Sequence, residues 1–182
     1  MEGVGPGIFQ FVGIFLTGSL YSGMLFFSCY PNSSREIFIV IGFVGLEAPP
    51  LGYLKLNVDG AMLRDGSKGG IGGFLRNIEG RCIASFYGSV GQGCPILIEL
   101  LAVKYGLDNF LGLSVDSNMR LIMECDSKVA VDWILNPERC QSLFLSLVHN
   151  IQSLLLRCRA FLKHIPRGAN IEVDILAKKG IG

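Results

Sequence analysis

The chain has 182 residues, half of them hydrophobic and 17% charged, which suits one domain of about 100–150 residues with an additional segment. This composition supports a hydrophobic core and excludes a disordered chain. The net charge of +1 is unevenly distributed. Residues 1–50 carry one base and three acids, a net charge of −2, whereas residues 51–182 carry fifteen bases and twelve acids, a net charge of +3.

Residues 1–50 form a hydrophobic N-terminal extension. Its segment 8–27 is apolar and, at about 20 residues, long enough to cross a bilayer as a helix. Glycines at positions 13, 18 and 23 lower its helix propensity, and no basic residue precedes it. Two interpretations remain open: a single-pass membrane anchor at 8–27, or a poorly ordered extension that the following domain does not need. Pro49 and Pro50 then indicate an extended linker.

From Tyr53 onward, Leu54, Leu56 and Val58 alternate with polar residues, which predicts a strand that Gly60 ends. Further strands are predicted at 71–76 and 81–87, joined by a turn at 77–80, and at 120–125 and 160–165. Helices are predicted at 95–110, 127–135, 143–155 and 169–179, the last one ended by Gly180. Three consecutive strands followed by crossover units predict an α/β fold with a five-stranded mixed sheet and helices on both faces.

The glycines at positions 70, 72 and 73 fit the spacing of no phosphate-binding loop. We expect them to allow close approach of another backbone to this strand. Ser127, which follows directly after Asp126, is expected to cap a helix rather than to act as a nucleophile.

Four acids lie where they could share a cation. Asp59 and Asp126 come at the ends of two predicted strands, and the ends of adjacent strands are where open α/β sheets build their sites. Glu99 and Asp174 lie in helices otherwise rich in apolar residues, where an unpaired carboxylate is costly. Converging carboxylates repel one another unless cations neutralise them, and oxygen ligands select hard ions. The sequence therefore predicts a site for Mg²⁺ or Mn²⁺.

The six cysteines form no C-x-x-C pair, and the chain has only two histidines. This pattern predicts reduced thiols in a reducing compartment and no structural zinc site. We therefore expect an intracellular protein of the nucleus or cytoplasm, with single-pass membrane anchoring as the alternative location.

Several short stretches occur in a defined order over about 120 residues, and the order makes them specific as a set. They are KLNVDGA at 55–61, GIGGFLR at 70–76, ELLA at 99–102, ECDS at 124–127 with Trp133-Ile134, and HIPR at 164–167 with Asn170, Asp174 and LAK at 176–178. Through these stretches, residues 51–182 resemble the ribonuclease H-like domain of plant reverse-transcriptase-related, retrotransposon-derived proteins.

The resemblance implies a ribonuclease H fold with strand order 3-2-1-4-5 and metal-dependent cleavage of the RNA strand of RNA–DNA hybrids. It implies that two Mg²⁺ or Mn²⁺ ions are held by a catalytic tetrad, Asp59, Glu99, Asp126 and Asp174. Residues expected to contact the nucleic acid are Arg76, Arg167, Asn170 and Lys178. No obligate protein partner is indicated, and a membrane is a partner only through residues 8–27.

The sequence also departs from the family pattern. Ile98 and Val173 replace the alanine that usually precedes two of the acids, and Arg167 takes the position of a loop histidine that assists product release in many ribonucleases H. His164 is interpreted as a core or hydrogen-bonding histidine rather than a proton shuttle. Beside the ribonuclease, two hypotheses therefore stay open: a catalytically weak or inactive nucleic-acid-binding domain derived from a mobile element, and a membrane-tethered protein.

Overall fold

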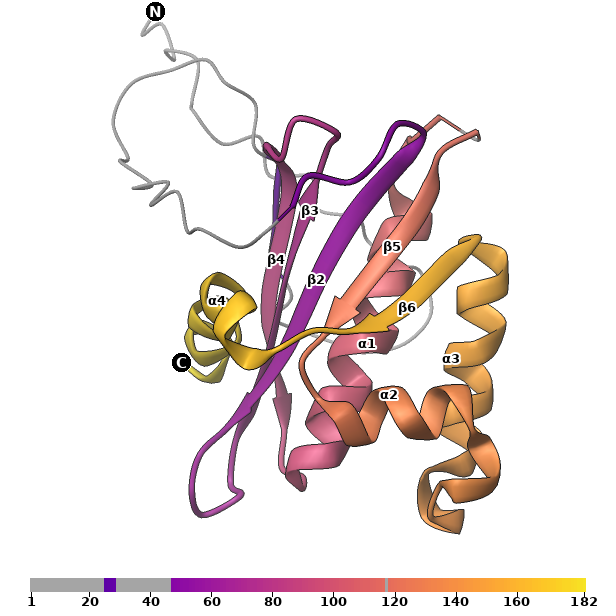
Figure 1. Cartoon of the computed structure of the whole chain (residues 1–182). Helices are drawn as coiled ribbons and strands as arrows, with labels where there is room; N and C mark the ends of the chain where they lie inside the picture. Colours follow the sequence, from indigo (N-terminus) through magenta and orange to yellow (C-terminus); the bar gives the residue numbers. More distant parts are fainter. Residues whose placement is uncertain (1–24, 29–46, 117) are drawn as a thin grey trace, which may run out of the picture.

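The computed structural model describes residues 25–28, 47–116 and 118–182 (Figure 1). The strands are β1 Leu25–Ser28, β2 Tyr53–Met62, β3 Gly69–Arg76, β4 Cys82–Gly91, β5 Arg120–Cys125 and β6 Ala160–His164. The α-helices are α1 Pro95–Gly112, α2 Lys128–Leu135, α3 Leu145–Arg157 and α4 Ile171–Ile181, with short 3-10 turns at Pro137–Arg139, Ser142–Phe144 and Arg167–Ala169. From β2 onward, the order of strands and α-helices is the predicted one.

The strands form one sheet in the order β1-β4-β3-β2-β5-β6. Strands β2 to β6 are the five predicted strands, and their order is the predicted 3-2-1-4-5, with an antiparallel half and a parallel half. Strand β1 was not predicted. It adds an antiparallel strand to β4, with Leu25 opposite Tyr87 and Ser28 opposite Ala84.

The expected membrane segment 8–27 lies mostly outside the described residues. Its last part, 25–27, belongs to strand β1 and not to a helix. Among the residues that the structure describes, no helix combines the length and the apolar character needed to span a bilayer.

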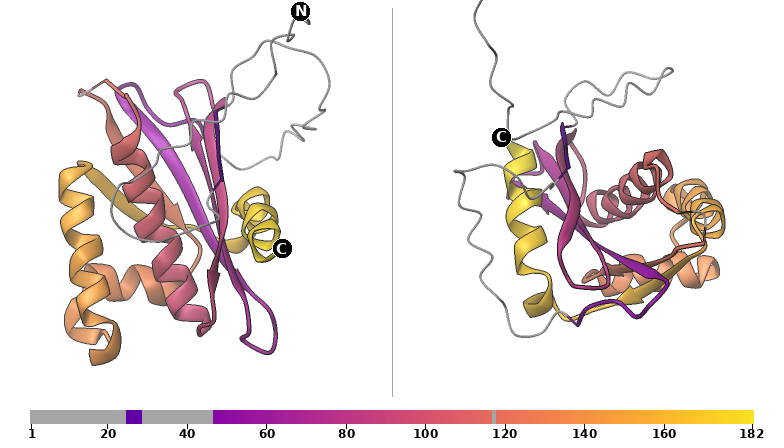
Figure 2. Two further views of the ribbon diagram at one scale, coloured as in Figure 1. Left: turned by 180° about the vertical axis from the view of Figure 1, so that it is seen from behind. Right: turned by 90° about the horizontal axis from the view of Figure 1, so that it is seen from above.

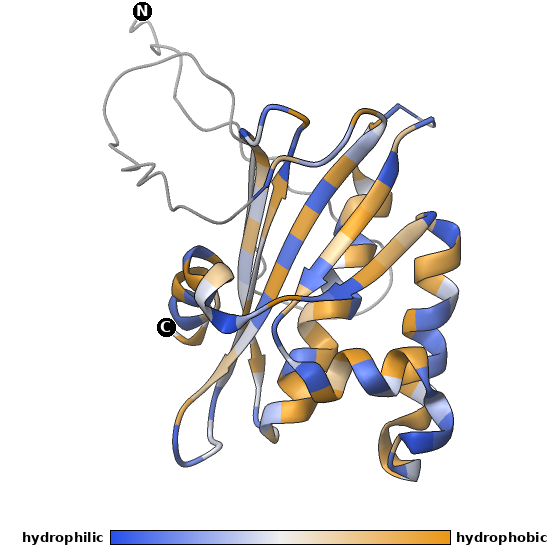
Figure 3. Ribbon diagram, in the orientation of Figure 1, coloured by the Kyte–Doolittle hydropathy of each residue, from blue (hydrophilic) through white to orange (hydrophobic). Residues whose placement is uncertain are grey.

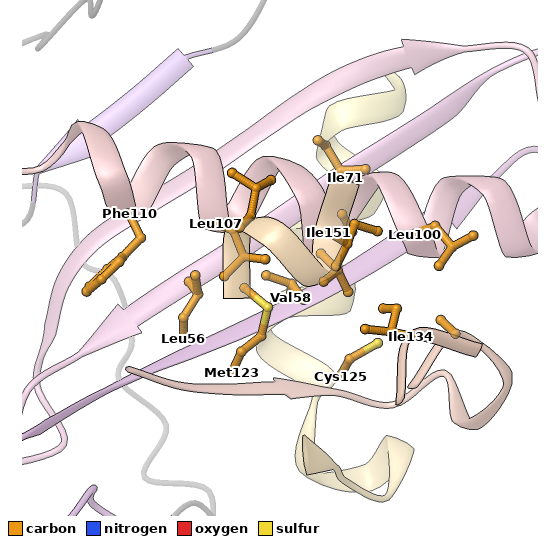
Figure 4. Packing of buried hydrophobic residues seen from close by; sticks show 14 of the residues in the cluster. Leu56, Val58, Ile71, Leu100, Leu107, Phe110, Met123, Cys125, Ile134 and Ile151 are labelled. Carbon is orange, nitrogen blue, oxygen red and sulfur yellow. The ribbon is translucent and has the colours of Figure 1, made fainter. Parts of the chain in front are cut away.

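Helices cover both faces of the sheet (Figure 2). Helices α1, α2 and α3 lie on one face, and α4 packs against β3 and β4 on the opposite face. The main core lies between the sheet and α1, where the completely buried side chains include Val58, Leu107 and Met123 (Figure 4). Along α3, Val148, Ile151 and Leu154 form the buried stripe. Leu143, the first residue of the predicted helix 143–155, is exposed in the preceding 3-10 turn.

Strand β2 shows the predicted alternation of apolar and polar residues (Figure 3). Leu54, Leu56 and Val58 are buried in the core, as expected. The polar residues of the other face, Lys55, Asn57 and Asp59, are also buried, with 6% or less of each residue exposed. Because buried polar groups need partners, this face of the sheet must be organised by ion pairs and hydrogen bonds.

Glycines allow α4 to lie directly on the sheet, which confirms the expectation of close backbone approach. A Cβ atom at Gly72 would lie 2.6 Å from the backbone nitrogen of Ala177 and 2.7 Å from the Cβ of Leu176. The prediction that Gly180 ends the last helix is wrong, since α4 continues to Ile181. Gly180 is buried, and a Cβ there would lie 2.5 Å from the carbonyl oxygen of Gly88, so its lack of a side chain serves packing.

Candidate metal centre

Asp59 lies on β2 at the point where the parallel half of the sheet ends. The parallel pairing of β2 with β5 stops at Val58 and Cys125, but β2 itself continues to Met62 because it remains paired with β3. The prediction that Gly60 ends the strand is therefore wrong, because Gly60 lies within β2. As a result, the Asp59 carboxylate emerges one residue beyond the parallel ladder, beside the end of β5.

Asp126 follows directly after β5, at the same edge of the sheet. The next residue, Ser127, is the N-cap of α2, and its hydroxyl oxygen accepts a hydrogen bond from the backbone N–H of Ala130 at 3.4 Å. This confirms the expectation that Ser127 caps a helix. The strand end and the helix cap together fix the backbone on both sides of Asp126.

Glu99 is brought to this edge by the first turns of α1. Gly60 makes this possible, because a Cβ there would lie 2.9 Å from the backbone carbonyl of Ile98 and 3.0 Å from the backbone nitrogen of Glu99. Ile98 is itself buried, with 1% of its surface exposed. The helix therefore begins in direct contact with the backbone of β2 immediately after Asp59.

Asp174 comes from the first turn of α4, on the opposite face of the sheet from α1. Its side chain is 18% exposed and accepts a hydrogen bond from the ammonium group of Lys178, one turn later. The guanidinium of Arg167 lies 3.9 Å from its other oxygen. Asp174 is thus the member of the set with the most cationic surroundings.

The structure brings these carboxylates close enough to change one another's ionisation. Burial, followed by the charge of Asp126, a hydrogen bond with Asp126 and the charge of Asp174, raises the pKa of Asp59 to about 7. Burial, followed by the charges of Asp59 and Asp126, raises the pKa of Glu99 to about 8. Each proton held at these sites offsets a repulsion that the fold itself creates.

Two carboxylate oxygens of the cluster are buried without a hydrogen-bond donor in the described part of the chain. Asp59 Oδ2 and Glu99 Oε2 are buried and have no hydrogen-bond partner among the residues that the structure describes. Buried acceptors of this kind are rare unless a ligand, ion or water satisfies them. A divalent cation would satisfy both and neutralise the repulsion, and an all-carboxylate donor set fits Mg²⁺ or Mn²⁺.

Cys125 also lies beside the acids. Single ligand atoms of Glu99, Cys125 and Asp126 all lie within 4.8 Å of one another. Burial, together with the charge of Glu99, raises the pKa of the Cys125 thiol well above its ordinary value. Because only the thiolate is a good metal ligand, Cys125 behaves here as a buried apolar group, and the donor set remains one of carboxylates.

The four residues expected to contact nucleic acid have two different environments. Arg167 and Lys178 have side chains that are 82% and 63% exposed beside Asp174, where they are accessible to a phosphate. Arg76 and Asn170 are buried instead, with 7% and 1% of the residue exposed. The Arg76 guanidinium and the Asn170 side-chain N–H donate hydrogen bonds inside the protein, so the structure does not support direct nucleic-acid contacts by these two.

Of the two alternatives for His164, a core or a hydrogen-bonding histidine, the first is wrong. His164 is exposed at the end of β6, opposite Cys125 in the adjacent strand. The backbone N–H of the following residue, Ile165, donates a hydrogen bond to the carbonyl of Cys125 at 3.0 Å, and Ile165 is buried in its place.

Sequence reasoning missed a set of polar residues next to the acids, of which Lys55, Asn57 and Glu124 are buried and Glu172 is partly exposed. Two of them, Asn57 and Glu172, are the partners of Arg76. The available signal was positional for the two strand residues. Asn57 and Glu124 stand two residues before Asp59 and Asp126, and in a strand this spacing places side chains on the same face. Glu172 lies in helix α4, where the same spacing gives no such signal.

A five-stranded order of 3-2-1-4-5, with acids at the ends of two adjacent parallel strands and on two helices, defines a ribonuclease H-like α/β domain. Residues 57–180, more than half of the chain, match the family model described as reverse transcriptase-like, and the chain belongs to this family.

Individual proteins agree with this assignment. An Arabidopsis thaliana protein named "putative ribonuclease H protein" is 29% identical in an alignment of 142 residues that covers 74% of this chain. The chain spans about a fifth (21%) of that relative's length. Among solved structures, the ribonuclease H1 of the archaeon Halobacterium salinarum superposes with a TM-score of 0.64 at 18% identity, covering 70% of this chain and 96% of its own. The N-terminal ribonuclease H domain of a Mycobacterium tuberculosis protein gives a TM-score of 0.62 at 20% identity, with coverages of 71% and 93%. These structures establish the shared fold.

Proposed function

We propose that this chain is a metal-dependent endoribonuclease that cleaves the RNA strand of RNA–DNA hybrids. The observation that carries the proposal is the convergence of Asp59, Glu99 and Asp126 at one sheet edge, with Asp174 facing Asp59 from α4. Two of these acids have raised pKa values and unsatisfied buried oxygens, which is the state expected of ligands in the absence of their cation.

In this proposal the four carboxylates hold two Mg²⁺ or Mn²⁺ ions. When bound at such a site, two divalent ions supply an activated water and stabilise the leaving oxygen of a phosphodiester. The protein contributes the rigid placement of the ligands, since Asp59 and Asp126 are fixed by the sheet and Glu99 by the contact of α1 with Gly60. Asp174, whose side chain is 18% exposed, completes the set from α4.

Arg167 and Lys178 are proposed to hold the phosphate backbone next to the acids. Both are exposed and cationic, and both lie beside Asp174, so a phosphate bound by them would be presented at the metal centre. Selectivity for a hybrid would come from contacts to the 2′-hydroxyl groups of one strand and from the shape of the groove. A ribonuclease H1 of the same fold, at 18% identity and a TM-score of 0.63, has been solved in complex with an RNA/DNA hybrid, which supports this choice of substrate.

The test is a cleavage assay with the full chain on an end-labelled RNA–DNA hybrid, in Mg²⁺ and in Mn²⁺, with and without chelator. We expect cleavage of the RNA strand that stops on chelation and is absent on matched RNA and DNA duplexes. An Asp126→Asn variant, which preserves the size of the side chain, should lose cleavage. Hybrid cleavage that persists in chelator, or in this variant, would contradict the proposal.

A second candidate function is nucleic-acid binding without useful turnover, and the position of Arg167 favours it. A permanently charged, 82% exposed guanidinium beside the acids grips phosphate more firmly than a histidine that can lose its proton. In the same assay this function predicts metal-dependent binding of the hybrid, measured by a gel shift, with at most one cleavage event for each protein molecule.

A further inference from the structure

A layer of polar side chains, buried except for the partly exposed Glu172, lies next to the acids. Three of its members each precede an acid by two residues: Asn57 before Asp59, Glu124 before Asp126, and Glu172 before Asp174. The first two lie on β2 and β5 and the third in the first turn of α4. The layer therefore includes residues of β2 and α4, which carry Asp59 and Asp174, and of β5, which ends directly before Asp126.

Arg76 of β3 connects this layer. Its Nη1 donates a hydrogen bond to the Oδ1 of Asn57 at 2.9 Å, and its Nη2 is bonded to the carboxylate of Glu172. The Nδ2 of Asn57 in turn donates to the Oε2 of Glu124 at 2.9 Å, and the ammonium of Lys55 lies 3.3 Å from the Oε1 of Glu124. We call Lys55, Asn57, Arg76, Glu124 and Glu172 the Arg76 network.

The network matters most for the placement of α4. Strands β2 and β5 are already held in register by their backbone ladder, in which Asn57 lies opposite Glu124. Helix α4 lies outside the sheet, so its position along the sheet depends on side-chain contacts and packing. Arg76 bonds to Glu172, two residues before Asp174, and the side-chain amide of Asn170 donates to the carbonyl of Val58 at 2.9 Å.

A second force acts in the opposite direction. The charge of Asp174 faces that of Asp59, which belongs to the sheet, so the two carboxylates repel each other and push the first turn of α4 away from β2. A planar guanidinium with two engaged nitrogens resists this displacement better than packing alone, because it fixes both distance and orientation. The flat glycine surface at Gly72 supplies close contact but no directional bond.

We propose that Arg76 is a positioning residue: it joins β2 to the first turn of α4 and so holds Asp174 next to Asp59 before a divalent cation binds. The inference rests on the proposed function in one respect, the assignment of these acids as metal ligands. It gives a role to a residue that sequence reasoning had placed at the nucleic-acid interface.

The experiment measures the affinity of the metal-free full chain for Mn²⁺ by calorimetry. Two variants are compared with the wild type at a temperature at which circular dichroism shows each to be folded. Arg76→Lys keeps the charge but loses the fork that reaches two partners, and Arg76→Met loses both. The matched control is Lys104→Met, which removes a half-buried cation from an ion pair with Asp108 on α1.

We expect Arg76→Lys to weaken Mn²⁺ binding by about tenfold, the lower end of the range for residues that orient metal ligands. Arg76→Met should weaken it at least as much, although the loss of a nearby positive charge by itself would strengthen the binding of a cation. The Lys104→Met control should bind as the wild type does. Amide hydrogen exchange at Val173 and Asp174, which both donate to the carbonyl of Asn170, should become faster in the metal-free Arg76→Lys variant.

The outcomes separate the two proposals. A wild-type chain that binds no Mn²⁺ would overturn the proposed function and this inference with it. A wild-type chain that binds Mn²⁺, together with a folded Arg76→Lys variant that binds equally well, would overturn the positioning role alone. If Arg76→Met does not fold, the Arg76→Lys variant still decides the question, because its charge is unchanged.

Discussion

Replacing Asp59 by asparagine is the most direct test of the electrostatics at the acid cluster. The substitution keeps the size of the side chain and removes a carboxylate that is 2% exposed and repelled by two others. It should have opposite effects on activity and on stability. Cleavage of a hybrid should be lost while hybrid binding is retained. Without metal, the variant should be more stable than the wild type at alkaline pH.

The magnitude follows from the pKa of Asp59, about 7 in the folded chain against an ordinary 3.8. A carboxyl group whose pKa is raised by folding stabilises the fold fully below pH 3.8, and this contribution is lost as the pH rises through 7. Between pH 5 and 7 the folded chain holds this proton and the unfolded chain does not, which costs the wild type about 1.36 kcal/mol for each pH unit. The stability difference between Asp59→Asn and the wild type should therefore grow by roughly 2–3 kcal/mol from pH 5 to pH 8.

The assay is urea unfolding in chelator at several pH values from 5 to 9. Asp132→Asn is the matched control, because Asp132 is paired with Arg139 at the surface of α2, away from the cluster. Its stability difference from the wild type should change little with pH. If the stability curves of Asp59→Asn and the wild type run parallel across this range, folding does not raise the pKa of Asp59, and mutual repulsion does not govern the ionisation of the cluster.

Four further predictions follow from the same structure. Saturating Mn²⁺ should raise the free energy of unfolding more at pH 8 than at pH 6, because protons compete for Asp59 and Glu99; equal gains at both pH values would contradict this. Gly72→Ala should destabilise the chain by about 1–3 kcal/mol by overpacking against α4, whereas Gly168→Ala, which would meet nothing within 4 Å, should be nearly neutral in the same urea titration. Arg167→His should raise the multiple-turnover rate of hybrid cleavage and leave the rate of the first turnover within roughly tenfold of the wild type. Arg167→Ala should reduce the salt dependence of hybrid binding by roughly one phosphate contact. Unchanged salt slopes would show that Arg167 does not contact the nucleic acid. A chain that begins at Ala48 should unfold cooperatively and still bind Mn²⁺, because β2 to β6 and all four acids follow that position; a molten product would show that the preceding residues belong to the core.

Much of the fold could be predicted because local patterns and tertiary structure agree. The alternation of Leu54, Leu56 and Val58 predicts a strand with one apolar face, and that face is the one buried against α1. The order of strands and helices then restricts the sheet to a few topologies, and the resemblance of the short stretches selects one. The four acids remain predicted ligands: Asp59 and Asp126 are singled out by their places at strand ends, and Glu99 and Asp174 by an apolar context in which an unpaired carboxylate is costly.

What the sequence by itself determined is therefore the sequence of elements and the identity of the acids, both of which depend on neighbours along the chain. Only the tertiary structure decided which polar residues are buried. Whether Arg76 is buried depends on where Glu172, 96 positions later, packs against it. No local pattern contains that information. The same holds for β1, which depends on the unpaired edge of β4, and for Gly180, whose role depends on the approach of Gly88. Long-range side-chain pairing and close backbone contact arise from the packing of whole elements, so they become visible only when the chain is folded.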